Sequence, residues 1–284
     1  MSSSDSRISP TAHYTGMVWA RNGLSHRALE SFRGRAMYTL LQPVVRVARR
    51  AGVPDVDQFL LTRHRLIDAR LVQAVESGAI TQVVEIAAGL SPRGWRFKQR
   101  FGDRIEYIEA DLPGMAALKR AALKKMGASP GHRVVAFDAL ADEGPLSLSA
   151  LCAGLDRSRG MAIVTEGLVN YFSEAAVRGM WRRFAKELAG FSCGAYWSDL
   201  FLSSDVGGKG ATPFIHFLSA FVRGKVHLHF AQTSAAEQAL RECGFADARL
   251  LDPGDHAEAL GDATGISRSV RVVEARVAAP SSAI

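Results

Sequence analysis

The chain has 284 residues, of which 48% are hydrophobic and 22% are charged, a composition that allows one large α/β domain with a buried core. No run of about 18 uncharged apolar residues occurs, so we predict no transmembrane helix and no membrane partner. The formal net charge is +7, but the arginines are spread along the chain, which argues against a dedicated nucleic-acid surface.

The chain begins with MSSSDSRISP, which lacks the apolar segment of a signal peptide. Its three cysteines, Cys152, Cys193 and Cys243, are far apart in sequence, and none belongs to a CxxC motif. This pattern predicts neither a disulfide framework nor a zinc site, and we expect at least two of the thiols to lie in the core. A cytoplasmic location is therefore expected.

Residues 14–80 are predicted to be helical throughout. Two stretches, SHRALESFRGRAMYTLLQPVVRVARRAG and DVDQFLLTRHRLIDARLVQAVESG, carry apolar residues at helical spacing; Pro43 is expected to interrupt the first and Gly78 to end the second. We expect a disordered lead over 1–12, a helical cap over 13–80, a core over 81–277 with a substrate-covering insertion at about 203–230, and a disordered tail over 278–284.

From residue 81 onward, short apolar runs alternate with helical patterns such as MAALKRAALKKMG and EAAVRGMWRRFAKELAG. The runs predicted as strands are QVVEIAAG, RIEYIEADLP, HRVVAFDAL, GMAIVTEGL, GAYWSDLFL, ADARLLDP and SRSVRVVEARV. This alternation predicts an α/β fold, in which a mostly parallel seven-stranded sheet carries helices on both faces. Ligands of such sheets lie at the carboxyl ends of the strands.

Four successive predicted strands end in or near a carboxylate, and the first also ends in small residues. The residues concerned are Glu85, Ala87, Ala88, Gly89, Asp111, Asp138 and Glu166. Small residues allow close approach of a ligand, and an acidic residue about 20 positions further on is placed to bind ribose hydroxyls. The loop lacks the G-x-G-x-x-G pattern of a diphosphate site, and a diphosphate would be repelled by carboxylates. A cationic nucleoside, S-adenosylmethionine, fits these features.

The carboxylate of such a cofactor needs a basic partner. LTRHRLID, in the helix before the first strand, offers Arg63 and Arg65, and arginine binds carboxylates through two parallel hydrogen bonds. Because the two arginines are two residues apart on a helix, they cannot face the same way. We expect one to face the cofactor and the other to lie on the surface.

Taken together, these features resemble the leucine carboxyl methyltransferase family, and within it the bacterial O-methyltransferases of polyketide biosynthesis. The matching stretches are TAHYTGMVWARNGLS, TRHRLID, VEIAAGLSPRG, YIEADLPGMAALK, FDAL and TEGLVNYF, between about residues 11 and 202. The resemblance implies a class I methyltransferase (Rossmann-like) fold, with S-adenosyl-L-methionine as methyl donor and S-adenosyl-L-homocysteine as product. It implies a cofactor site formed by Arg63, Glu85, Ala87, Ala88, Gly89, Asp111, Leu112, Asp138, Ala139 and Glu166.

The predicted reaction is methyl transfer to an oxygen of a small, secondary-metabolite-like acceptor. A carboxylate acceptor needs no base, whereas a hydroxyl acceptor does. The candidates for catalysis are Glu166, Tyr171 and His13. The candidates for acceptor contacts are Tyr14, Trp19, Tyr171, His216 and Phe217. We expect no metal, because His227 and His229 share a face in HLHF but have no third ligand nearby.

Other functions remain open at this stage. A protein C-terminal carboxyl methyltransferase would share the motifs, and a cofactor-binding protein that has lost catalysis would keep the same cofactor residues. An RNA-binding or RNA-modifying protein is suggested only by the net charge, and the missing glycines argue against a Rossmann dehydrogenase. We expect a small-molecule methyl acceptor as partner, no nucleic acid, and a monomer or homodimer.

Overall fold

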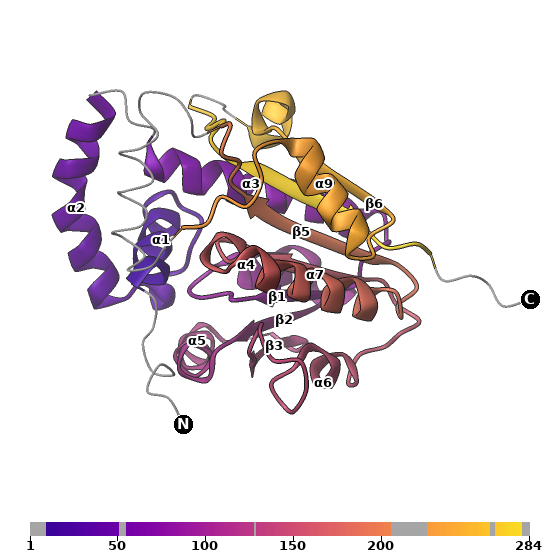
Figure 1. The fold of residues 1–284 in the computed structure, drawn as a ribbon. Helices are drawn as coiled ribbons and strands as arrows, with labels where there is room; N and C mark the ends of the chain where they lie inside the picture. The colour runs from indigo at the N-terminus through magenta and orange to yellow at the C-terminus, as the bar shows by residue number, and fades with distance from the viewer. Residues whose placement is uncertain (1–9, 51–54, 128, 206–225, 262–264, 280–284) are drawn as a thin grey trace, which may run out of the picture.

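The computed structural model describes residues 10–50, 55–127, 129–205, 226–261 and 265–279, and Figure 1 shows a sheet with helices on both faces. The strands are β1 (Gln82–Ile86), β2 (Glu106–Asp111), β3 (His132–Ala136), β4 (Met161–Thr165), β5 (Gly194–Leu200), β6 (Asp247–Leu251) and β7 (Arg271–Arg276). They form one sheet in the order β3-β2-β1-β4-β5-β7-β6, in which only β7 runs antiparallel to its neighbours. All seven predicted strands and their mostly parallel arrangement are confirmed.

Apolar side chains on alternate strand positions build a core on each face of the sheet. The first face is covered by α3 (Val56–Glu76) and α4 (Arg93–Phe101), and its buried residues include Leu66, Leu71, Phe97, Val83, Val164 and Trp197. The second is covered by α6 (Leu148–Cys152), α7 (Glu174–Leu188) and α9 (Thr233–Glu242), and its buried residues include Leu148, Trp181, Phe184, Leu240, Val84 and Ile163. Consecutive residues Val83 and Val84 thus serve opposite cores, as the two-residue period of a strand requires.

The remaining elements are the cap helices, the helix α5, which contacts β2 and β3, and short 3₁₀ turns. They are α1 (Pro10–Arg21), α2 (Phe32–Arg50), α5 (Pro113–Met126), and the 3₁₀ turns η1 (Arg27–Leu29), η2 (Gly102–Arg104), η3 (Val169–Tyr171) and η4 (Pro253–Leu260). None of the described helices is long and apolar enough to cross a membrane.

Cys152 and Cys243 are buried and Cys193 is half-buried, so the prediction that at least two thiols lie in the core is confirmed.

The helical cap differs from the sequence prediction in three places. Helix α1 begins at Pro10, inside the expected disordered lead, and the chain leaves the helix near Gly23, which has a φ of +71°. The prediction that Pro43 interrupts a helix is wrong, because α2 continues through it. Pro43 and Thr39 are both exposed, so the Thr39 carbonyl that Pro43 leaves unbonded can face water. The expected helix stop at Gly78, with a φ of +77°, is confirmed.

The second residue of helix α4, Gly94, lies tightly against β2 and β3. A Cβ atom on Gly94 would overlap the side chains of Glu109, Tyr107 and His132. By contrast, Gly114 occupies the same second position in α5, and a Cβ atom there would meet nothing within 4 Å. Gly94 is therefore required for helix packing on the sheet, whereas Gly114 is not.

We predict that Gly94→Ala lowers the free energy of unfolding by about 1–3 kcal/mol, because the added methyl group forces α4 away from the sheet. Gly114→Ala is the matched control and should raise the free energy of unfolding by roughly 0.4–1 kcal/mol through the entropy of the unfolded chain. Urea denaturation of both variants is the measurement. Equal effects of the two substitutions would contradict the packing role of Gly94.

Candidate functional site

The loop that follows β1 has an unusual backbone that is held by the end of β2. Ala87 has a φ of +55°, the one positive value at a non-glycine residue in the described chain, and Gly89 has a φ of +51°. The Ala87 amide donates to the Ala110 carbonyl at 2.8 Å. The Asp111 carboxylate accepts hydrogen bonds from the amides of Gly89 at 2.7 Å and Leu112 at 2.8 Å. Burial raises the pKa of Asp111 despite these bonds.

The ends of the parallel strands are level, so their loops meet at one edge of the sheet. Ile86 of β1 is in register with Ala110 of β2 and with Thr165 of β4. After β3, Asp138 and Ala139 are half-buried, and the Asp138 carboxylate accepts a hydrogen bond from the amide of Leu140 at 2.9 Å. The residues expected to form a cofactor site from β1, β2, β3 and β4 therefore share one edge.

Glu166, just after β4, is paired with the residue predicted to bind the cofactor carboxylate. Arg63 of α3 donates from Nε to Glu166 at 3.2 Å and from Nη1 to Asp199 of β5 at 2.7 Å. Asp199 also accepts from the amide of Gly167 at 2.6 Å. Burial alone would lower the pKa of Arg63, but Asp199 and Glu166 outweigh it and raise that pKa. Arg63 is thus fixed between two strands.

Arg93, at the start of α4, is the centre of the buried charges. Its side chain is fully enclosed and donates to Asp68 of α3 at 2.5 Å, to Glu85 of β1 at 2.6 Å and to Glu166 at 2.5 Å. His64 Nδ1 lies 2.8 Å from the same Glu166 oxygen. Burial would raise the pKa of Glu166, but His64, Arg93 and Arg63 hold it well below its usual range.

These contacts form one connected set, which we call the buried network. Its members are Arg63, His64, Asp68, Glu85, Arg93, Arg96, Glu166 and Asp199. Glu85 was expected to contact the cofactor. Its carboxylate instead accepts hydrogen bonds from Arg93 and, at 2.8 Å, from the Tyr107 hydroxyl. Of these residues, the sequence prediction included Arg63, Glu85 and Glu166 and missed the others.

A second buried cluster of charged residues contacts the loop that follows β1. Lys119 of α5 pairs with Glu109 of β2 at 2.6 Å, and Glu109 also lies 2.9 Å from His132. Lys119 donates to the carbonyl of Ser91 at 2.5 Å as well, so it joins β2 to the loop. Lys119 and His132 pull the pKa of Glu109 down against the effect of burial. The sequence held a signal for both clusters, because a charge inside a buried strand needs a partner.

Helix α1 covers the loop with one face. A Cβ atom on Gly16 would lie 3.2 Å from Leu90, and one on Gly89 would lie 3.3 Å from Ala12. Trp19, on the same face, packs against His64 with ring centroids 4.8 Å apart and the ring planes tilted by 41°. Trp19, an expected acceptor contact, therefore touches the buried network directly.

His13 and Tyr14 lie on the side of α1 that meets the other cap helices. His13 is buried, its Nδ1 lies 2.7 Å from the Ser31 hydroxyl, and its Nε2 has no hydrogen-bond partner among the described residues. Burial, followed by the positive charge of Arg33, lowers the pKa of His13. The Tyr14 hydroxyl donates to Asp57 at 2.8 Å.

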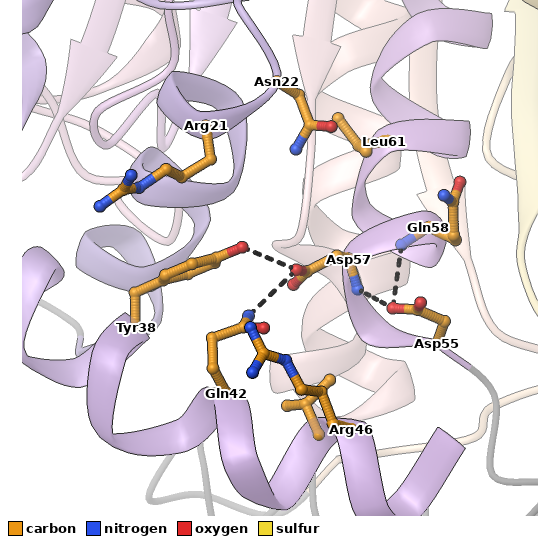
Figure 2. Close-up of a pocket in the computed structure, with 10 residues that line it drawn as sticks. Arg21, Asn22, Tyr38, Gln42, Arg46, Asp55, Asp57, Gln58 and Leu61 are labelled. Atoms are coloured by element: carbon orange, nitrogen blue, oxygen red, sulfur yellow. Dashed lines mark hydrogen bonds between the residues drawn. The ribbon is translucent and has the colours of Figure 1, made fainter. Parts of the chain in front are cut away.

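Asp57 forms one wall of a polar cavity of about 380 Å³ between α1, α2 and α3. Figure 2 shows Tyr38 and Gln42 of α2 directed at the Asp57 carboxylate, to which they donate at 3.1 and 3.3 Å. Burial, followed by the charge of Asp57, raises the pKa of Tyr38 to about 12. The cap helices are therefore held together by polar as well as apolar contacts.

Tyr171, in η3, neighbours a segment that returns to the site after β5. Asn170 exchanges hydrogen bonds with His227 at 2.7 and 2.8 Å, and His229 lies 2.7 Å from the Phe172 carbonyl. Tyr171 is close enough to Arg63 to raise its pKa electrostatically. His216 and Phe217, expected to contact the acceptor, lie outside the described residues. Within the described chain, no group of three potential ligands is placed to hold a metal ion.

The strained backbone at Ala87 gives a first prediction for the site. A left-handed conformation costs a non-glycine residue about 1–2 kcal/mol, and glycine loses roughly 0.4–1 kcal/mol through unfolded-chain entropy, so Ala87→Gly should raise the free energy of unfolding. Ala88→Gly, at the adjacent buried position without a positive φ, should lower it. Chemical denaturation distinguishes the two variants, and a loss of stability in both would refute strain at Ala87.

The buried network gives a second prediction. Arg93→Met leaves three carboxylates without their shared partner and should lower the free energy of unfolding by about 3–5 kcal/mol. Arg96→Met is the control, because Arg96 also pairs with Asp68 but its side chain is 32% exposed; it should cost at most about 1 kcal/mol. Guanidinium denaturation curves provide the comparison. Similar costs for both variants would mean that burial does not strengthen the Arg93 contacts.

Comparison with known proteins places these features in a family. The family model described as leucine carboxyl methyltransferase matches residues 20–185. A protein of Mycobacteroides abscessus named "Putative S-adenosyl-L-methionine-dependent methyltransferase" is 34% identical over 165 residues, which are 57% of this chain and 50% of that protein. The chain thus spans about half the length of this relative.

Two solved structures share the fold at low sequence identity. A duf574 family protein from Streptomyces avermitilis has a TM-score of 0.64 at 14% identity, covering 96% of this chain and 99% of that chain. A "putative methyltransferase" from Thermobifida fusca has a TM-score of 0.61 at 17% identity, covering 94% and 97%. These neighbours support the class I methyltransferase fold. Because the family model matches more than half of its length, the chain belongs to the leucine carboxyl methyltransferase family.

Proposed function

We propose that the chain is an S-adenosyl-L-methionine-dependent methyltransferase that acts on an oxygen of a small, secondary-metabolite-like acceptor. The observation that carries the proposal is the position of Arg63 beside Glu166, at the point where the strand order reverses between β1 and β4. Ligands of open α/β sheets bind at such a reversal. The M. abscessus relative, named for the same cofactor, supports this assignment.

The side chains at the strand ends fit the cofactor. The Arg63 Nη2 group donates no hydrogen bond to the described residues, so it is available to a carboxylate. Each carboxylate oxygen of Asp111 accepts one backbone hydrogen bond and can accept another from a ribose hydroxyl. Asp138, with Leu112 and Ala139 nearby, is assigned to the adenine. In this arrangement Glu85 acts indirectly, by holding Arg93.

The carboxylate of Glu166, held ionised beside Arg63, also suits a sulfonium. When bound, S-adenosyl-L-methionine supplies an already activated methyl group, and the protein has to position the acceptor and exclude water. Helix α1 lies against the loop and can provide that exclusion.

The acceptor decides whether a base is needed. For a carboxylate acceptor we assign binding contacts to Trp19, Tyr171, His216 and Phe217. Tyr14, also expected at the acceptor, is fully buried with its hydroxyl on Asp57, so it supports the cap instead. For a hydroxyl acceptor we assign His13 as the base, because its lowered pKa keeps the imidazole neutral at pH 7 and its Nε2 forms no hydrogen bond with the part of the chain that the structure describes. Glu166, held ionised by its neighbours, is then assigned to position Arg63 and the cofactor.

Cofactor binding is tested with S-adenosyl-L-homocysteine by calorimetry. Arg63→Ala would leave Glu166 and Asp199 unpaired, so Arg63→Lys is the better variant; it should weaken binding roughly 10–100-fold, the loss expected for one charged hydrogen bond. Asp111→Asn should weaken binding as well. Arg65→Ala, two residues away on α3 and half-buried, should bind as the unchanged chain does. Undiminished affinity in folded Arg63→Lys and Asp111→Asn would refute the assigned cofactor site.

The role of His13 is tested through the pH dependence of methyl transfer, once an acceptor has been found by screening small hydroxyl and carboxyl compounds. If the acceptor is a hydroxyl, the rate should be constant above about pH 6.5 and fall as the pH drops through the lowered pKa of His13. His13→Gln should abolish this dependence and lower the rate by about 10²–10⁴. A carboxyl acceptor should show neither effect. An intact rate in His13→Gln with a hydroxyl acceptor would exclude His13 as the base.

A further inference from the structure

Helix α2 carries an apolar stripe on the outside of the molecule. Phe32, Leu40, Val44 and Val47 are 80%, 76%, 54% and 66% exposed, and they account for four of the six large hydrophobic side chains that are exposed in the described chain. Leu40, Val44 and Val47 are spaced i, i+4 and i+7, so they lie on one face. Figure 1 shows α2 at the outer edge of the molecule, beyond α1 and away from the sheet.

The same helix is strongly basic. Over Phe32–Arg50 it contains five arginines and no acidic residue. Four of them, Arg33, Arg35, Arg46 and Arg50, are exposed and form no ion pair with the described residues. A surface helix whose arginines had a structural role would be expected to pair some of them with nearby carboxylates, as Arg178 of α7 does with Glu174 and Glu242.

The apolar stripe and the unpaired arginines together define one kind of partner. A second copy of the chain would bring another five arginines to the contact, and the like charges would repel. A nucleic acid would use the arginines but would leave the apolar stripe in water. Helices with a basic polar side and an exposed apolar face insert shallowly at the surface of anionic bilayers. Against the expectation from sequence that the chain has no membrane partner, we propose that α2 docks the protein on an anionic lipid surface, with Leu40, Val44 and Val47 among the acyl chains.

The docking is tested by sedimentation of the full chain with vesicles. The chain should bind vesicles of mixed phosphatidylcholine and phosphatidylglycerol and should not bind pure phosphatidylcholine. Binding should fall at about 1 M salt, where the Debye length is roughly 3 Å. Leu40→Glu and Val47→Glu should each weaken binding about ten-fold or more, the factor for withdrawing two CH₂ groups. Arg50→Gln should weaken it about five-fold, and Arg50 is chosen because Arg46 lines the polar cavity of the cap.

Ala121→Glu is the matched control, because it introduces the same charge at an exposed position of α5 and should leave binding unchanged. Several results would overturn the proposal. One is an absence of binding to anionic vesicles at low salt. Another is unchanged vesicle binding in Leu40→Glu together with competition by polyuridylate, which would identify a polyanion surface. A dimer that Leu40→Glu dissociates would identify a second copy as the partner. A large fall in the melting temperature of Leu40→Glu would show that the stripe is covered within the chain.

Discussion

The enclosed guanidinium of Arg93 constrains the rest of the site. It joins α3, β1 and the loop after β4 through Asp68, Glu85 and Glu166, and these carboxylates take the place of water around its own fully buried side chain. A buried cation is tolerated only while its partners stay at hydrogen-bonding distance. The three elements are therefore fixed relative to one another by a single side chain, and Arg63 adds β5 to the same assembly through Asp199.

This arrangement is better explained by geometry than by stability. Buried ion pairs often contribute little net free energy, since a well-packed apolar cluster of similar volume can be as stable. Such ion pairs fix the positions of side chains, because each arginine N–H donates in a direction that is set by the planar guanidinium. Glu166, held by Arg63, His64 and Arg93, stays ionised and oriented before any ligand arrives. A site whose side chains are locked by their neighbours avoids the cost of ordering them on binding.

The strands and helices could be predicted from sequence because apolar runs and helical spacing are local patterns. The parallel topology then predicted that the carboxylates after the strands lie at one edge of the sheet. The continuation of α2 through Pro43 could not be predicted from sequence. It is tolerated because the unbonded Thr39 carbonyl can face water, and only the fold determines that Thr39 and Pro43 are exposed. Most of the buried network was also missed, since Arg63 and Asp199 are 136 residues apart and Arg93 and Asp68 are 25 apart. A usable signal did exist: Asp199 stands within the apolar run GAYWSDLFL, where an unpaired charge is not tolerated.

The close fit of α1 on the loop after β1 has a consequence for the sequences of related proteins. A Cβ atom at position 16 would lie 3.2 Å from the Cβ atom of Leu90, so glycine at 16 allows the closest approach of α1 to the loop. A side chain at 16 would push α1 and the loop apart by a few tenths of an ångström, because every residue except glycine carries a Cβ atom at position 90. Homologues in which α1 lies equally close to the loop should therefore keep glycine at position 16, whatever the size of the side chain at position 90.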